Sequence, residues 1–219
     1  MATIFLDGKP VRYTVRTTPN TKHVHLRIKP NLMLDVSIPS RSNLSVWSLL
    51  RKKKDWITRK IDETRGRVKL FDGKRVLYKG AYHRVKAAKS KKPTIGNGTI
   101  TLPVERHARL EQALKQWMAK ETETLVKRRL AVYAKKYGFP VNGFSVGDMK
   151  KWAHCTEGGS LSFNWQLIGL PRELSDYVIL HELSHLKEFN HSRRFKYRLA
   201  SVCPNFKERD HMLRRFVAK

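Results

Sequence analysis

The chain has 219 residues, enough for one large domain or two small ones, and its 40% hydrophobic content excludes a disordered protein. It carries 46 lysines and arginines against 18 aspartates and glutamates, a formal net charge of +28 at pH 7. Such an excess attracts polyanions, so nucleic acid is the first candidate partner, followed by an anionic membrane surface or an acidic protein. A solvated basic surface with no dedicated partner is the simpler interpretation.

The chain shows no sign of a secretory or membrane-spanning segment. Its first residues lack a charged leader followed by an apolar run, and no stretch approaches the roughly 18 apolar residues that a membrane span needs. Two cysteines, Cys155 and Cys203, are too few for a disulfide framework, although one bridge between them stays open. We therefore expect a reduced, cytoplasmic protein that does not enter a membrane.

The first part of the chain predicts strands followed by a helix. Apolar and polar residues alternate over 11–16, 23–28 and 32–38, as in half-buried strands. Residues 43–63 then predict a helix. Its apolar stripe consists of Trp47, Leu50, Ile57 and Ile61.

The same helix carries a run of four basic residues. These candidate nucleic-acid contacts are Arg51, Lys52, Lys53 and Lys54. Lys54 falls on the apolar stripe, where its stem would lie along the core and its charge would reach water. A solvated helix face is the simpler interpretation of the run.

A second β region and a long helix follow. Strands are predicted over 75–78, 82–87 and 99–102, and a helix over 105–137 that Gly138 ends. The remaining pattern predicts a strand over 161–167 and three helices, over 171–188, 192–202 and 206–216. No internal repeat is found. We expect an α+β protein with a β-rich basic N-terminal region over residues 1–103 and a second domain over 104–219, unless both form one compact unit.

The chemistry concentrates in the sequence His181-Glu182-Leu-Ser-His185, an H-E-x-x-H pattern. On a helix, residues i and i+4 share a face, so both imidazoles can reach one ion. Zinc accepts imidazole ligands and lowers the pKa of a bound water to about 7, and Glu182 is placed to take that water's proton. The alternative is two unrelated surface histidines, and the apolar context argues against it, since buried histidine and glutamate need partners.

A third ligand must come from outside the pattern. We expect His191, with Glu208 and Glu188 as alternatives, because a catalytic zinc site has three protein ligands. His191 requires the helix to end and the chain to return. Asn190 suits a left-handed position at the end of the helix, and Ser192 suits the cap of the next helix. A structural zinc site is the competing interpretation, but it would have four protein ligands and no use for Glu182.

The C-terminal third resembles the YgjP-like metallopeptidase family. The resemblance lies in the run from His181 to Phe195 and in Cys203-Pro-Asn-Phe-Lys207, with weaker likeness in Trp152-Ala-His-Cys155 and Leu161-Ser-Phe-Asn-Trp165. It extends less specifically over the N-terminal strands, so it covers nearly the whole chain. It implies a small zincin domain with an antiparallel edge strand and distant kinship to WLM and SprT-type proteases. The ligands then fall on His181, His185 and His191, and the base on Glu182.

Two further expectations follow from the resemblance. The family usually has Trp-Gly-Ser-Cys where this chain has Trp152-Ala153-His154-Cys155, and we expect His154 to fill the space of a smaller residue rather than to act as a donor in the site. The strand over 161–167 would lie along the active-site cleft, where an extended substrate could pair with its edge. Tyr197 and His154 are the candidate oxyanion donors.

The sequence thus predicts a zinc-dependent peptidase acting on protein or peptide substrates, which DNA or RNA could bring to it through the basic surface. The alternative is a basic nucleic-acid-binding protein whose zinc site is structural or vestigial. An intact Glu182 favours the peptidase, because a structural site does not need that carboxylate.

Overall fold

A computed structural model describes residues 2–19, 21–29, 31–41, 44–104 and 109–217. The chain divides into two compact units, residues 1–67 and 68–219, and each is described by itself. The expected mixed α+β architecture is confirmed. The division between compact units lies at residue 67, so the boundary expected near residue 103 falls inside the second unit. No helix in the described part of the chain is both long and apolar enough to span a bilayer.

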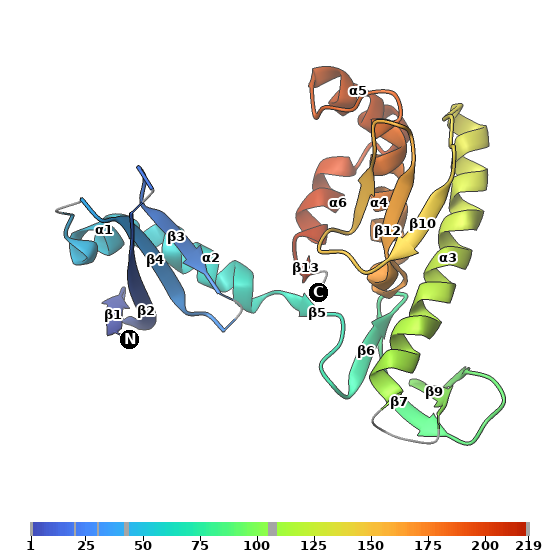
Figure 1. Cartoon of the computed structure of the whole chain (residues 1–219), viewed down its shortest axis with the longest axis horizontal. Helices are drawn as coiled ribbons and strands as arrows, with labels where there is room; N and C mark the ends of the chain where they lie inside the picture. Colours follow the sequence, from blue (N-terminus) through green and yellow to red (C-terminus); the bar gives the residue numbers. More distant parts are fainter. Residues whose placement is uncertain (1, 20, 30, 42–43, 105–108, 218–219) are drawn as a thin grey trace. The chain divides into compact units, whose positions relative to one another are not determined.

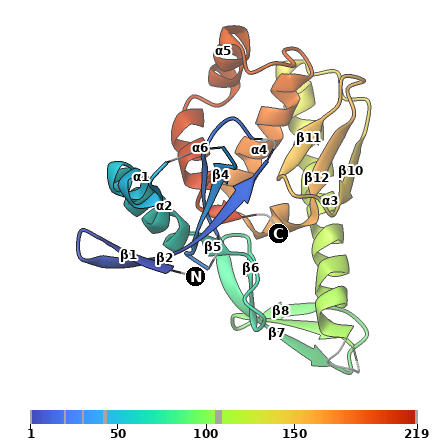
Figure 2. The ribbon, with the colours of Figure 1, turned by 60° about the vertical axis from the view of Figure 1, so that its left-hand side comes forward.

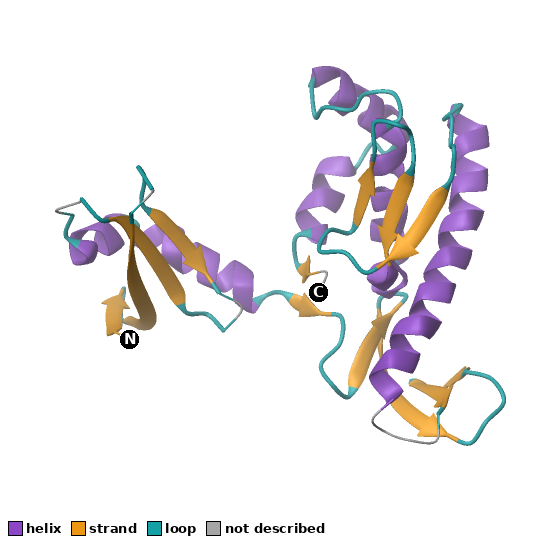
Figure 3. Ribbon diagram, viewed as in Figure 1, coloured by secondary structure: helices purple, strands orange, loops and turns teal. Residues whose placement is uncertain are grey.

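The first unit is a four-stranded sheet followed by two helices (Figure 3). The strands follow the order β1-β2-β4-β3, with β2 and β4 parallel and the other pairs antiparallel. Their bounds are β1 (Ala2–Leu6), β2 (Lys9–Thr18), β3 (His25–Ile28) and β4 (Leu34–Pro39), and the helices are α1 (Val46–Lys52) and α2 (Lys54–Arg65). The hydrophobic core of this unit consists of Ile4, Leu6, Val11, Leu34, Val36, Leu50, Ile57 and Ile61.

The single helix expected over 43–63 is in fact two. Lys53, with φ −101° and ψ 14°, breaks the helical path between α1 and α2, and residue 43 lies outside the described residues. The break turns α1, so Leu50 is buried while Trp47 is 53% exposed. The expected burial of Trp47 was therefore wrong.

The second unit begins with another four-stranded sheet of the same topology. Its order is β6-β7-β9-β8, again with one parallel pair, β7 and β9. Their bounds are β6 (Arg75–Tyr78), β7 (Ala81–Ala88), β8 (Thr94–Gly96) and β9 (Thr99–Pro103). Each sheet starts with a hairpin whose two turn residues have positive φ, Asp7-Gly8 in one and Lys79-Gly80 in the other, as two-residue type I′ turns require. The structure thus repeats an arrangement that the sequence does not reveal.

The 28-residue helix α3 (Leu110–Tyr137) links this sheet to the rest of the unit (Figure 1). Its N-terminal half packs on β6 and β9 through Leu114 and Met118, and its C-terminal half joins the core of the C-terminal region through Val126 and Leu130. The helix ends at Gly138, as predicted, and this residue has the left-handed conformation (φ 64°). The expected start near residue 105 lies outside the described residues.

The C-terminal region consists of a three-stranded sheet covered by helices (Figure 2). Its elements are β10 (Phe144–Gly147), β11 (Ala153–Cys155), β12 (Leu161–Asn164), the 3-10 helix η2 (Trp165–Gly169), α4 (Arg172–His185), α5 (Arg193–Val202) and α6 (Phe206–Leu213). Two short strands, β5 (Val68–Lys69) and β13 (Phe216–Val217), pair in parallel and join the two ends of the unit. The expected last helix, 206–216, therefore ends early.

The edge strand of this sheet is not the one expected. The order is β10-β12-β11, so β12 is central and both of its edges are paired. The strand also stops at Asn164, whose side chain accepts from the Gln166 N–H and begins η2 instead of continuing to residue 167. Because β11 pairs antiparallel with β12 alone among the described strands, β11 is the antiparallel edge strand.

Candidate metal centre

Helix α4 positions the H-E-x-x-H residues. It is buried on most sides, with Val178, Ile179 and Leu183 in the core. This burial fixes the rotation of the helix, so His181 and His185 share the face that turns toward α5. Glu182 lies next to them, with 8% of its surface exposed.

The chain then turns back to bring His191 to the same place. Helix α4 ends at His185. The backbone then makes a tighter turn, in which the Leu186 N–H donates to the Leu183 carbonyl three residues earlier (3.2 Å). Ser192 caps α5 as predicted, accepting from the Phe195 N–H at 3.3 Å. Asn190 does not have the predicted left-handed conformation. The return is made by a tight turn in which the Ser192 N–H bonds the Asn190 carbonyl.

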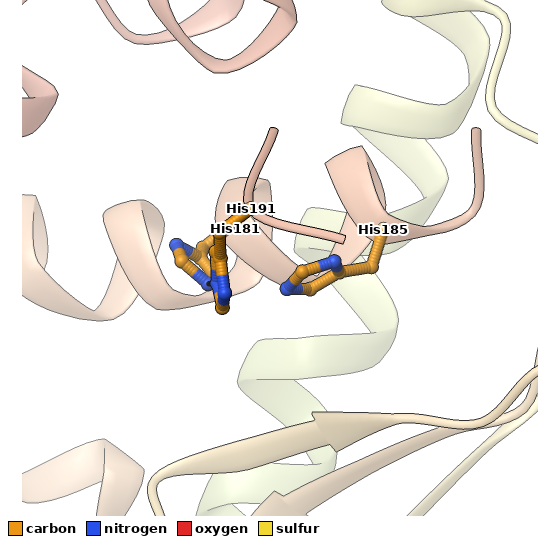
Figure 4. Close-up of side chains that lie close together, drawn as sticks. All are labelled: His181, His185 and His191. Atoms are coloured by element: carbon orange, nitrogen blue, oxygen red, sulfur yellow. Dashed lines mark hydrogen bonds between the residues drawn. The ribbon is translucent and has the colours of Figure 1, made fainter. Parts of the chain in front are cut away.

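The three imidazoles converge on one point (Figure 4). One ring nitrogen from each of His181, His185 and His191 lies within 4.8 Å of the others, and the Nε2 atoms of His181 and His191 are 3.0 Å apart. Nitrogen ligands bound tetrahedrally to zinc at 2.0–2.1 Å are separated by about 3.4 Å. The spacing of these donors therefore fits a zinc ion, and Phe195 stacks on His185 at 4.5 Å between centroids to hold that ring.

The outer nitrogens of two rings have partners of their own. His185 Nδ1 lies 3.2 Å from the Glu188 carbonyl, and His181 Nδ1 lies 3.5 Å from the Tyr177 hydroxyl, which donates to Asp210 Oδ1 at 3.3 Å. Such partners accept the Nδ1 proton, which leaves Nε2 free for a metal. Sequence reasoning missed Tyr177 and Asp210. Tyr177 stands four residues before His181 and could have been found from helical spacing, whereas Asp210 arrives from α6 through tertiary packing.

Burial sets the protonation of the site. It lowers the pKa of His181 to about 4, and the neighbouring His185 and His191 lower it further. Burial also lowers the pKa of His185. Both rings are therefore neutral near pH 7, as metal ligands must be. Burial raises the pKa of Glu182 to about 7, and nearby Lys151 opposes that rise. A carboxyl group with this pKa can both accept and return a proton near neutral pH.

The remaining sequence candidates lie outside this cluster. The described metal-binding group contains neither Glu208 nor Glu188, and Glu188 reaches His185 only through its backbone carbonyl. His154 is exposed on β11, so the expectation that it fills internal space was wrong. Tyr197 is 71% exposed on α5. Cys155 and Cys203 are both buried and free, so no bridge joins them.

The basic run belongs to the first unit, and the three histidines belong to the second. Arg51, Lys52 and Lys53 are exposed around the break between α1 and α2. The Arg51 guanidinium lies 4.1 Å from the Trp47 ring centroid, and Lys54 Nζ bonds Asp7 Oδ1 at 2.9 Å. Lys54 is therefore engaged within the unit, while the other three cations face solvent.

Comparison with known families is decisive for the class of protein. Residues 22–216 match the family described as YgjP-like, metallopeptidase domain. The chain belongs to the YgjP-like metallopeptidase family. The match includes α4, His191 and most of both units, and it confirms the resemblance seen in the sequence. Neither a curated protein nor a solved structure gives a significant match.

Proposed function

We propose that this YgjP-like protein is a zinc-dependent peptidase whose metal is held by His181, His185 and His191. The observation that carries the proposal is the convergence of three imidazole nitrogens within 4.8 Å, from a buried helix and the turn that follows it. When bound, zinc would polarise the scissile carbonyl and activate a water molecule for attack. The family, a metallopeptidase domain, supports this class of reaction.

Glu182 is proposed as the general base. Its carboxylate follows the first ligand directly on α4, and its raised pKa of about 7 suits proton transfer from water and then to the leaving amine. Burial raises the pKa of the Cys155 thiol, and the charge of Glu182 adds to that rise, in keeping with the packing of α4 against β11. A base between the histidines and an edge strand is well placed to act on a peptide bound along that strand.

The edge of β11 is proposed to bind the substrate backbone. Among the described strands β11 has one neighbour, β12, so its outer edge can pair with an extended peptide through main-chain hydrogen bonds. Such pairing depends little on side chains, which predicts broad sequence preference. The exposed His154 at the centre of β11 would then lie beside the bound peptide.

The first unit is proposed to bring the peptidase to protein associated with nucleic acid. The supporting observation is the exposed Trp47 with Arg51 over one face of its ring, next to Lys52 and Lys53. Exposed aromatic and cationic groups together suit stacking of bases and contact with phosphates. With no base-reading motif present, this binding should not depend on sequence.

Metal removal and restoration test the proposed hydrolysis. Protein stripped with a chelator should not cut an unstructured, quenched-fluorescence peptide library, and one equivalent of zinc should restore cleavage. Magnesium serves as the control ion, because it prefers oxygen ligands and should restore nothing. Cleavage by stripped protein at the full rate would contradict the proposal.

A further inference from the structure

A second candidate site lies at the other end of α4. A cavity of about 460 Å³ opens between α3, η2, the start of α4 and the β6–β7 turn, with Leu125 and Ile168 on its apolar side. Arg172, which lines it, is the first residue of α4, and His185 is the last. At 1.5 Å per residue the two are about 20 Å apart along the helix, so the cavity is not part of the metal centre.

The lining of the cavity is strongly cationic. Four basic residues line it, Lys79, Arg128, Arg129 and Arg172, and no acidic residue is among its described lining residues. Two of the arginines share one carboxylate, because Asp176 Oδ1 lies 2.8 Å from Arg129 Nε and Asp176 Oδ2 lies 3.7 Å from Arg172 Nε.

Asp176 is thus the ion-pair partner of two of the four cations. Neither Lys79 nor Arg128 has an ion-pair partner in the described part of the chain, so the cavity keeps an uncompensated positive charge. An anion with more than one negative charge would balance it.

The position of Lys79 is fixed by the backbone. Its φ of 50° places a lysine in a left-handed turn position, which side chains other than glycine and asparagine rarely adopt. The turn is held against η2 by two bonds, from the Lys79 N–H to the Ile168 carbonyl (2.8 Å) and from the Gly80 N–H to the Gly169 carbonyl (3.0 Å). The ammonium lies 4.8 Å from the Tyr78 ring centroid at the cavity rim. The rim is therefore a fixed element rather than a mobile loop.

The cavity also receives the positive end of α4. The helix has 14 residues, and its N-cap, Pro171, provides no side-chain hydrogen bond to the first turn. The helix dipole adds a partial positive charge at this end. This term reinforces the four side chains, which remain the main source of the positive potential.

We propose that this cavity binds phosphate groups. Arginine presents a planar set of donors that matches phosphate oxygens in pairs, and three of the four cations are arginines. A volume of 460 Å³ exceeds what a single phosphate needs and leaves room for the organic part of a nucleotide unit. The phosphate comes either from a free anion or from the backbone of DNA or RNA. The inference goes beyond the proposed hydrolysis and stands whether or not that hydrolysis is found.

The test removes the two unpaired cations from the full chain. Lys79→Asn keeps a residue that suits the left-handed turn, and Arg128→Gln changes an exposed position of α3. The matched control is Lys120→Gln with Lys127→Gln, which removes the same charge from exposed positions of α3 outside the cavity. Binding is measured by the fluorescence anisotropy of a labelled single-stranded oligonucleotide at fixed salt.

The double variant Lys79→Asn with Arg128→Gln, called the cavity pair, should bind the oligonucleotide at least about tenfold more weakly. Each of the two cations makes charge-assisted hydrogen bonds to phosphate. The control pair should retain most of the affinity. Equal losses in the two pairs would overturn the proposal, since they would show that only the total charge matters. If Lys79→Asn lowers the melting temperature, the single variant Arg128→Gln is used for the test instead. It should lose several-fold in affinity for the oligonucleotide. An unchanged affinity would contradict phosphate binding in the cavity.

Inorganic phosphate separates the two sources. It is titrated against the bound oligonucleotide, with sodium chloride at matched ionic strength as the control. If phosphate displaces more oligonucleotide than chloride does, and this extra displacement is lost in the cavity pair, the cavity accepts a single free phosphate. Binding that depends on Lys79 and Arg128 but resists inorganic phosphate identifies successive backbone phosphates instead. Inorganic phosphate that displaces the oligonucleotide equally from the wild type and the cavity pair would contradict the proposal.

Discussion

The two four-stranded sheets of this protein share their strand order, their parallel pair and their type I′ hairpin, yet they are followed by different helices. In the first unit α1 and α2 are short and interrupted at Lys53, and they complete a small core of their own. In the second unit α3 runs for 28 residues without a break and connects the sheet to the core around α4. One sheet topology thus serves two purposes. In the first unit it belongs to a separate basic unit, and in the second it supports the region that holds the metal centre.

This difference predicts a division of labour between the units. Changes at the histidine end of α4 should affect metal binding and hydrolysis, whereas changes in the cavity at its other end should affect phosphate binding. Changes at the end of α1 should affect only association with polyanions. Each of the following predictions would sharpen that division if confirmed and would break it if contradicted.

The largest effect is expected at Glu182. Glu182→Gln keeps the shape of the side chain and removes the base, so peptide hydrolysis should fall by about 10²–10⁴-fold while the zinc content stays that of the wild type. Oligonucleotide binding, assigned to other residues, should not change. Full activity in this variant, or loss of its metal, would show that Glu182 does not have the proposed role.

The next effect separates the candidate ligands. His191→Ala should weaken zinc binding by more than the 10–100-fold typical of removing an outer-shell partner, because it removes a direct ligand. Glu208→Ala is the matched comparison, and it should leave zinc affinity almost unchanged because Glu208 is not in the histidine cluster. Competition with a chromophoric chelator measures both. The reverse ranking would move the third ligand to α6.

A smaller effect tests whether the second sheet belongs to the metallopeptidase unit. A Cβ on Gly169 would lie 2.8 Å from the Leu77 carbonyl oxygen and 2.9 Å from Leu70 Cδ2, so Gly169→Ala must push η2 away from β6. We expect a decrease of about 1–3 kcal/mol in unfolding free energy, measured by chemical denaturation, with hydrogen exchange increasing in β6–β9 and around α4 together.

Gly147→Ala is the control for this substitution, because nothing lies within 4 Å of its Cβ position. It should change stability by no more than about 0.5 kcal/mol. If Gly169→Ala increased exchange in the sheet alone, the sheet would be independent, as its counterpart in the first unit is.

The smallest effect belongs to the first unit. Replacing Arg51, Lys52 and Lys53 with Gln should reduce the slope of log affinity against log salt by up to about 3 for oligonucleotide binding, because each cation that neutralises a phosphate adds about one to that slope. Lys54→Gln should change it less, because Lys54 is paired with Asp7. Hydrolysis of a free peptide should be unaffected in both. A lower rate on free peptide would place these residues in the catalytic machinery instead.

The sequence predicted what local spacing determines. The H-E-x-x-H helix, the stop at Gly138 and the Ser192 cap each depend on residues within a few positions, and the structure has all three. The convergence of His191 on the pair followed from the same local reasoning, although the turn that achieves it does not use a left-handed Asn190.

Pairing across the chain could not be read in this way. The three residues of β11 are too few to show alternation, so the edge was assigned to β12, which is central. The exposure of Trp47 depends on the break at Lys53, where neither glycine nor proline marks an interruption. Asp210 reaches Tyr177 only because α6 packs on α4. These features depend on tertiary contacts between residues far apart in sequence.

The metal content of the purified full chain tests the central claim most directly. Elemental analysis should find about one zinc per chain, and X-ray absorption should show nitrogen ligands at about 2.0–2.1 Å. The same measurement on His181→Ala should find the zinc gone. A wild-type protein that holds no transition metal after zinc is supplied, or that holds it with oxygen or sulfur ligands alone, would contradict the account.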